Sequence, residues 1–138
     1  MWTKEVSKKT TASREQIWNL WTDVENWNKW DNEVEYSELY GSFEAGTFGI
    51  LKPTNGPKSK FQLTSVDKLH SFTSRSFLPF TKMDFIHEMS EEEGSLIVTH
   101  IVSIKGPLTF LFSKVIGEKL ISELPKALEN LSKMAEKD

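Results

Sequence analysis

The spacing of hydrophobic residues changes twice along the chain and divides it into three regions. Residues 2–10 alternate weakly, which predicts a strand. Ser13 and Gln16 match a capping box, and the residues behind them recur at the spacing of one helical face: Ile17, Leu20, Trp21 and Val24. Asp23 is then expected to cap a second short helix.

The middle region, from about 33 to 104, has period two with turn residues between the runs. The connections are short, which favours an antiparallel meander. The predicted strands are 33–40, 46–52, 59–67, 69–77, 81–90 and 95–104. We leave open which way the first two of these strands face.

The last region, 107 to about 136, predicts one long helix, which begins after Gly106-Pro107. Pro125 removes one backbone hydrogen bond and should kink this helix. Its apolar stripe consists of Leu120, Leu124, Leu128 and Leu131. The order of elements predicts an α+β fold in a single domain over 1–138. A curved antiparallel sheet of about seven strands would wrap around the C-terminal helix, and two short helices would follow the first strand.

Composition and charge narrow the classes of function. The chain has 138 residues and a net charge of -3, without a basic stripe that could follow nucleic acid. It has no cysteine, which excludes disulfides, thiolate zinc sites and a cysteine nucleophile. No signal core and no apolar run of the roughly 20 residues needed to span a bilayer is present. We therefore expect a cytoplasmic protein.

Several segments resemble one family. The segment 41–53, GSFEAGTFGILKP, is similar to a G-x-F-x-x-G-T-x-G-x-L-K-P pattern, and DVENW at 23–27 and LP at 124–125 add to the likeness. In this order they resemble the START/polyketide cyclase-dehydrase-like (SRPBCC) superfamily. The resemblance implies a helix-grip fold and a hydrophobic cavity, with no bound metal and no cofactor. Relatives bind hydrophobic small molecules, catalyse cyclisation, or act as co-chaperones or toxins.

Strand register indicates which side chains face inward. A loop at 91–94 would place His87 opposite Val98 and make His87 and His100 diagonal neighbours. The preceding hairpin places Phe72 opposite His87, and on the outer face it places Arg75 opposite Asp84. One hairpin further back, Leu63 is expected to face Phe72. All three hairpins predict the same inner surface.

The two inward histidines leave three interpretations open. They could be structural, they could bind a ligand through a polar contact, or one could act as a general acid or base, because histidine titrates near neutral pH. Two histidines without a third ligand make a poor zinc site, so no metal is expected. His70 is expected to face solvent.

Four of the five tryptophans lie between residues 18 and 30. Packing is the leading interpretation, with Trp21 in the core and Trp27 and Trp30 closing it as a lid. An amine cage and a membrane-surface belt are the alternatives. Neighbouring acids such as Asp23 and Asp31 argue against contact with anionic lipid.

The leading functional hypothesis is that a small hydrophobic ligand binds between the curved sheet and the last helix. The alternatives are a cyclase- or dehydratase-type enzyme that uses His87 or His100, and a co-chaperone-type module. A dry apolar cavity would favour binding, a histidine pair with a third polar group would favour catalysis, and a filled core with an exposed apolar patch would favour a protein partner. The expected wall residues are Phe61, Leu63, Phe72, Ser74, Met83, Phe85, His87, Val98, His100, Phe112, Val115 and Leu120.

Overall fold

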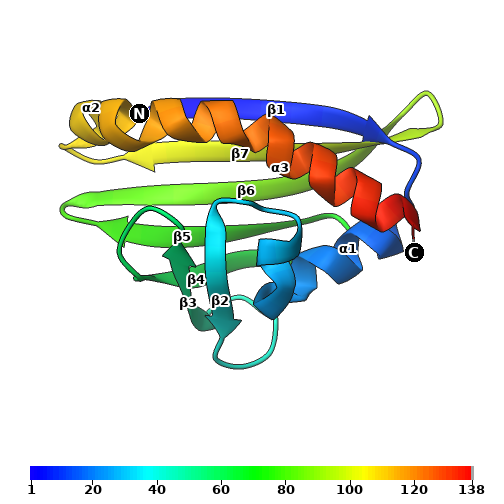
Figure 1. Ribbon diagram of the computed structural model, residues 1–138, viewed down its shortest axis with the longest axis horizontal. Helices are drawn as coiled ribbons and strands as arrows, with labels where there is room; N and C mark the ends of the chain where they lie inside the picture. The colour runs from blue at the N-terminus through cyan, green and yellow to red at the C-terminus, as the bar shows by residue number, and fades with distance from the viewer. Residues whose placement is uncertain (138) are drawn as a thin grey trace.

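The structure, a computed structural model, describes residues 1–137, apart from the side chains of residues 118, 120 and 121. One antiparallel sheet holds seven strands in the order β1-β7-β6-β5-β4-β3-β2 (Figure 1). The strands are β1 (Trp2–Thr10), β2 (Val34–Leu39), β3 (Phe48–Pro53), β4 (Ser59–Asp67), β5 (Ser71–Leu78), β6 (Thr81–Glu92) and β7 (Ser95–Lys105).

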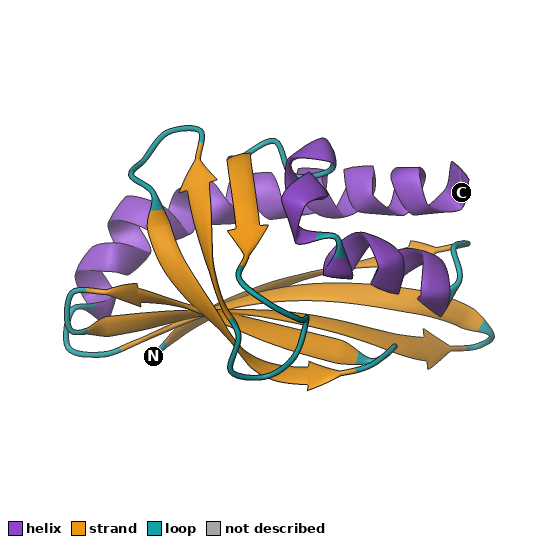
Figure 2. Cartoon of the chain, turned by 90° about the horizontal axis from the view of Figure 1, so that it is seen from below, coloured by secondary structure: helices purple, strands orange, loops and turns teal. Residues whose placement is uncertain are grey.

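The helices lie on one face of this sheet (Figure 2). They are α1 (Arg14–Thr22), the 3-10 helix η1 (Val24–Lys29), α2 (Thr109–Phe112), the π-helical turn η2 (Ser113–Gly117) and α3 (Glu118–Lys137). The sheet curves toward them, and β2 and β3 cross the direction of the longer strands (Figure 1). The predicted α+β fold class is confirmed. No helix among residues 1–137 is long and apolar enough to cross a membrane.

The predicted helix starts are partly confirmed. At α1, Ser13 Oγ accepts a hydrogen bond from the Gln16 amide at 3.2 Å, and Gln16 Oε1 accepts one from the Ser13 amide at 2.8 Å. This is the expected capping box. Asp23 precedes η1, but its side chain caps no backbone amide; it accepts a hydrogen bond from Asn26 Nδ2 at 2.8 Å instead.

The last helix is less regular than predicted, because the π turn η2 separates α2 from α3. Phe112 and Ile116, on the two sides of this turn, both pack against the apolar cluster of Met83, Val102 and Ile104. The π turn η2 therefore lies where the chain packs against the sheet. The spacing of apolar residues in the sequence does not reveal such an interruption of the helix. α3 continues through Pro125.

The hairpin of β5 and β6 has the predicted register. Phe72 pairs with His87, and Arg75 pairs with Asp84. The Arg75 guanidinium donates two hydrogen bonds to the Asp84 carboxylate, at 2.7 and 3.1 Å. This pair was expected on the outer face, and the Asp84 carboxylate is nevertheless buried.

The register of the last hairpin was predicted wrongly by two residues. His87 pairs directly with His100 rather than with Val98. The cause is the turn, which has only two central residues, Glu93 and Gly94, both with positive φ. An even shift leaves every side chain on its predicted face. The β4–β5 pairing is also shifted by two residues: Leu63 faces Ser74, before an irregularity in the strand.

The main core is aromatic, and Phe72 lies at its centre. The Phe72 ring contacts Trp18, Trp21 and Trp27 at centroid distances of 6.5, 5.4 and 6.2 Å. All four tryptophans between 18 and 30 are buried, so the packing interpretation holds, and it includes Trp18, which the helical stripe had left out. β2 and β3 bury Val34, Ser37 and Gly49.

α3 closes the core through two leucines of the predicted stripe, Leu128 and Leu131, which are buried. Leu124 is half-buried, and the side chain of Leu120 lies outside the described residues. Truncating Leu128 to alanine should lower the free energy of unfolding by about 2–5 kcal/mol, because it leaves a cavity in a packed core. Urea unfolding measures this loss.

The matched control is Leu111→Ala, since the Leu111 side chain is 45% exposed. This control should change the free energy of unfolding by about 0.5 kcal/mol or less. Equal losses in the two variants would contradict the packing of α3 on the sheet.

Candidate functional site

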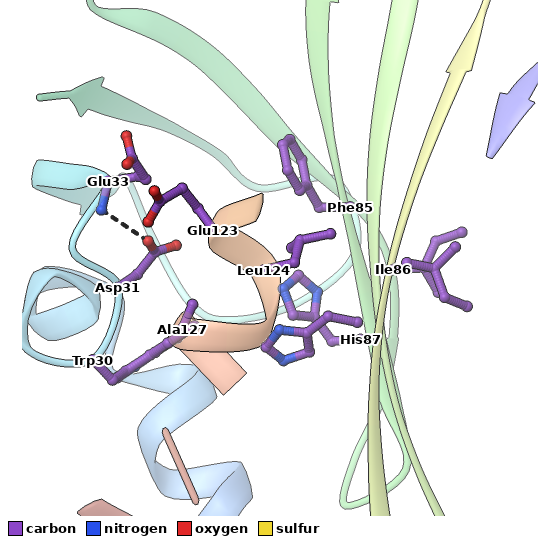
Figure 3. Close-up of a pocket in the computed structure, with 11 residues that line it drawn as sticks. Trp30, Asp31, Glu33, Phe85, Ile86, His87, Glu123, Leu124 and Ala127 are labelled. Carbon is purple, nitrogen blue, oxygen red and sulfur yellow. Dashed lines mark hydrogen bonds between the residues drawn. The ribbon is translucent and has the colours of Figure 1, made fainter. Parts of the chain in front are cut away.

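A small pocket lies where α3 crosses β6 and β7 beside the segment that follows η1 (Figure 3). Its volume is about 60 Å³. A water molecule occupies about 30 Å³ in the liquid, so the pocket holds only a few atoms. The residues that line it are Trp30, Asp31, Glu33, Phe85, Ile86, His87, His100, Ile101, Glu123, Leu124 and Ala127. The Ile86 side chain points away from the pocket (Figure 3).

This volume is far below the roughly 300 Å³ at which ligand-binding cavities usually begin. The apolar side chains expected to wall a larger cavity pack against the tryptophans instead. Phe61, Leu63, Phe72 and Val98 all belong to the main core and are at most 2% exposed. The space between sheet and helix is therefore largely filled.

The structure brings together three of the expected wall residues at the pocket: Phe85, His87 and His100. Met83 and Phe112 belong to the second apolar cluster, next to Phe85. Ser74 is buried, Val115 is 68% exposed, and the side chain of Leu120 is not described.

The two histidines form the floor of the pocket. As direct cross-strand partners, their rings meet edge to face with centroids 4.7 Å apart. His87 also stacks on Phe72 at 4.0 Å. Among the described residues, five buried side-chain atoms have no hydrogen-bond partner. Three of them belong to residues that line the pocket, His87 Nδ1, His100 Nε2 and Trp30 Nε1, and the other two are Trp21 Nε1 and Thr81 Oγ1. Buried polar atoms normally have such a partner, so the three nitrogens at the pocket are the unusual feature of the site.

Burial keeps the histidines neutral. It lowers the pKa of His100 to about 3. Burial lowers the pKa of His87 as well, and the adjacent His100 adds to this shift, while the backbone groups of Phe72 and Phe85 act on the ring in the opposite direction. A neutral imidazole has one donor and one acceptor nitrogen, so the floor can both donate and accept a hydrogen bond.

Three carboxylates surround the mouth of the pocket: Asp31, Glu33 and Glu123 (Figure 3). Burial raises the pKa of Asp31 to about 6, and the charges of Glu33 and Glu123 add to the effect. The Glu33 amide donates a hydrogen bond to Asp31 Oδ1 at 3.0 Å, which acts in the opposite direction. Lys119 Nζ lies 3.5 Å from Glu33 Oε2.

Sequence reasoning missed this acidic mouth. From the sequence, Asp31 is treated only as a charge near the tryptophans, and no site role is assigned to Glu33 or Glu123. Asp31 directly follows Trp30, which is buried. A charged residue next to a large aromatic residue of the core is the one local signal in the sequence that could have indicated a carboxylate with a shifted pKa. Among the side chains that the structure describes, no three histidine or acidic residues are placed to hold a metal ion.

No protein-family model matches the sequence, and no curated protein matches it either. Solved structures do resemble its fold. The crystal structure of Ara h 8.0201 has a TM-score of 0.76 and 11% identity, covering 99% of both chains. Norcoclaurine synthase from Thalictrum flavum has a TM-score of 0.72 and 16% identity, over 99% of this chain and 87% of that one.

A third similar structure is the di-domain ARO/CYC StfQ from the steffimycin biosynthetic pathway. Its TM-score is 0.77 at 10% identity, over 98% of this chain and 50% of that one. These likenesses extend over nearly the whole chain. They define it as a protein of the helix-grip fold, the fold that the sequence resemblance implied.

The buried histidines make stability depend on pH. Because the pKa of His100 is lowered by folding, the unfolded chain binds protons more readily below about pH 6.5, and the free energy of unfolding falls as the pH drops. Asp31 acts in the opposite sense between about pH 6 and 4, since folding raises its pKa. In the wild-type protein, His100 should make the free energy of unfolding fall by up to about 1.4 kcal/mol per pH unit between pH 6 and 4. His100→Phe should abolish this part of the fall.

Urea unfolding at pH 7, 6, 5 and 4 measures these slopes. His70→Phe is the matched control, because His70 is exposed, and it should keep the wild-type slope. An unchanged slope in His100→Phe would show that this ring is not held neutral by burial.

Proposed function

We propose that the chain binds a small molecule with an apolar stem and a polar end, in the pocket between β6, β7 and α3. The observation that carries this proposal is the set of three buried nitrogens without partners, on His87, His100 and Trp30. Leaving a buried polar group unpaired costs about 1–3 kcal/mol. A ligand that pairs with these groups recovers that cost.

The shape of the pocket suggests how such a ligand would lie. Phe85, Leu124 and Ala127 supply apolar side chains to the lining of the pocket. The small volume admits a stem of a few atoms, so a larger ligand would extend past the mouth toward solvent. The fold is compatible with this role, since two structural neighbours are named for small-molecule chemistry, one as a synthase and one as an ARO/CYC.

For the enzyme alternative, the candidate for the acid–base residue changes from a histidine to Asp31. A general base works best when its pKa lies near the working pH, and burial takes the pKa of His100 down to about 3. His87 is shifted in the same direction. Asp31, with a pKa of about 6, is better matched to proton transfer near neutral pH. A catalytic version of this site would use Asp31 at the mouth and the histidines as neutral hydrogen-bonding groups.

A second candidate function rests on an apolar end of the molecule, which holds both α2 and the β5–β6 turn (Figure 1). Gly106 at this end lies against the backbone of Phe80. The segments 75–82 and 105–115 contain four basic residues and no acidic one, although one of the four, Arg75, is paired with Asp84. A filled core with an exposed apolar and basic end favours a protein partner with an acidic surface. The exposed apolar side chains are Phe77, Phe80, Phe110, Leu111 and Val115.

A photo-crosslinking residue tests this second candidate. Placed at Phe80 in intact cells, it should capture one defined protein with an acidic surface, and the same residue at Tyr40, which is 59% exposed, should not. Phe110→Ser should abolish the capture. Equal capture from positions 80 and 40 would contradict a docking role for this end.

The pocket itself is tested with two four-carbon probes, 1-butanol and its apolar counterpart 1-chlorobutane. Chemical shifts of the Trp30 indole N–H and the His100 ring report binding. His100→Phe should weaken 1-butanol about 5- to 150-fold, as expected for a lost buried hydrogen bond of about 1–3 kcal/mol. It should leave 1-chlorobutane bound as well or better.

His100→Gln retains a donor and an acceptor and should restore part of the alcohol affinity. His70→Phe again serves as the control for an exposed histidine. If 1-butanol shifts neither Trp30 nor His100 at any concentration that leaves the fold intact, the pocket is not a ligand site.

A further inference from the structure

We propose that the pocket selects ligands whose polar end is a small ammonium group, held at the mouth by Asp31, Glu33 and Glu123. This inference rests on the proposed function and specifies the class of its ligand. It further predicts that carboxylic acids are rejected.

The first argument is the charge of the mouth. Asp31 and Glu33 come from the segment after η1 and Glu123 comes from α3, so folding brings three carboxylates to one opening. Lys119 lies against Glu33, at 3.5 Å, and it is half-exposed. Of the described residues, it is the one cation in an ion pair with this group. The mouth therefore keeps an excess of negative charge that a bound cation would relieve.

The second argument is independent of charge. His100 and Trp30 are each 4% exposed, and both have an unpartnered ring nitrogen. The Trp30 indole N–H can only donate, so His100 Nε2 is the nitrogen that can accept a hydrogen bond from an ammonium group. Trp30 also provides an aromatic surface of the kind that attracts ammonium groups. The carboxylates thus share the pocket with a buried nitrogen that can accept a hydrogen bond, and an ammonium group that enters the pocket can donate to a carboxylate and to His100 Nε2.

Charge then sets a ranking among ligands of one shape. An ammonium ion gains from all three carboxylates, an alcohol gains from none by charge, and a carboxylate adds a fourth negative charge. A bare metal ion does not fit as well, since no three ligating side chains within the described part of the chain are placed for it.

The protonation of Asp31 gives the ranking a pH dependence. The pKa of Asp31 is raised to about 6 by burial and by the charges of Glu33 and Glu123 that face it, with Lys119 paired to Glu33. A bound ammonium favours the ionised carboxylate. Its affinity should therefore rise from pH 5 to pH 7, and binding near pH 6 should release protons.

The experiment compares n-butylamine, 1-butanol and butyrate at pH 7 and low salt, with binding followed by the chemical shifts of Trp30 and His100. n-Butylamine should bind about tenfold more tightly than 1-butanol, which corresponds to about 1.4 kcal/mol. Butyrate should bind at least about tenfold more weakly than 1-butanol, by the same conversion.

Glu123→Gln tests the carboxylate directly. It should weaken n-butylamine about three- to tenfold, or roughly 1 kcal/mol, and leave 1-butanol unchanged. Glu129→Gln is the matched control on the same helix, where the carboxylate is exposed and pairs with Lys133. It should change neither ligand.

The outcomes separate this inference from the proposed function. If n-butylamine binds no more tightly than 1-butanol, the inference is wrong and the pocket remains a ligand site. If Glu129→Gln weakens the amine as much as Glu123→Gln, general surface charge explains the effect and the inference is again wrong. If none of the three probes binds, both proposals fail.

Discussion

The structure depends on one packing interaction, the stack of Phe72 on His87 in the centre of the sheet. This stack joins β5 to β6, and cross-strand pairing joins His87 to His100 on β7. Trp21 then closes over Phe72 and both histidines, with ring centroids 5.4 to 6.0 Å away. Because these rings fill the space under α1, the opening left near α3 is small.

The same packing determines the chemistry of the pocket. Rings that exclude water on several sides also remove the hydration that would stabilise an imidazolium, so the histidines are neutral. The carboxylates at the mouth are less deeply placed, and their mutual repulsion acts with burial to raise the pKa of Asp31. Neutral groups at the floor and negative groups at the mouth favour a ligand with one charged end.

Most of the fold could be predicted because its signals are local. The Ser13 capping box and the period-two strands depend on residues near one another in sequence. The pairing of Arg75 with Asp84 followed from a short turn. The predicted register of the last hairpin differs from the structure by two residues, because the turn consists of Glu93 and Gly94 alone. That even shift kept the inner face correct, yet it changed His87 and His100 from diagonal to direct neighbours.

The site was harder to predict, because it depends on tertiary distance. Asp31 and Glu123 meet only when α3 crosses the segment after η1, and no spacing in the sequence records that crossing. The volume of the pocket depends on how closely the tryptophans approach Phe72, which composition does not reveal. The break at η2 likewise accompanies packing of Phe112 and Ile116 on the sheet.

The most direct test of the central claim is the ¹⁵N chemical shift of the histidine ring nitrogens, measured at pH 7 with and without n-butylamine. The account predicts that His87 and His100 are neutral in the free protein. It also predicts that the shift of His100 Nε2 moves as the probe binds, while His70 does not respond. Protonated rings in the free protein, or a His100 nitrogen that stays unchanged when the probe is bound, would contradict it.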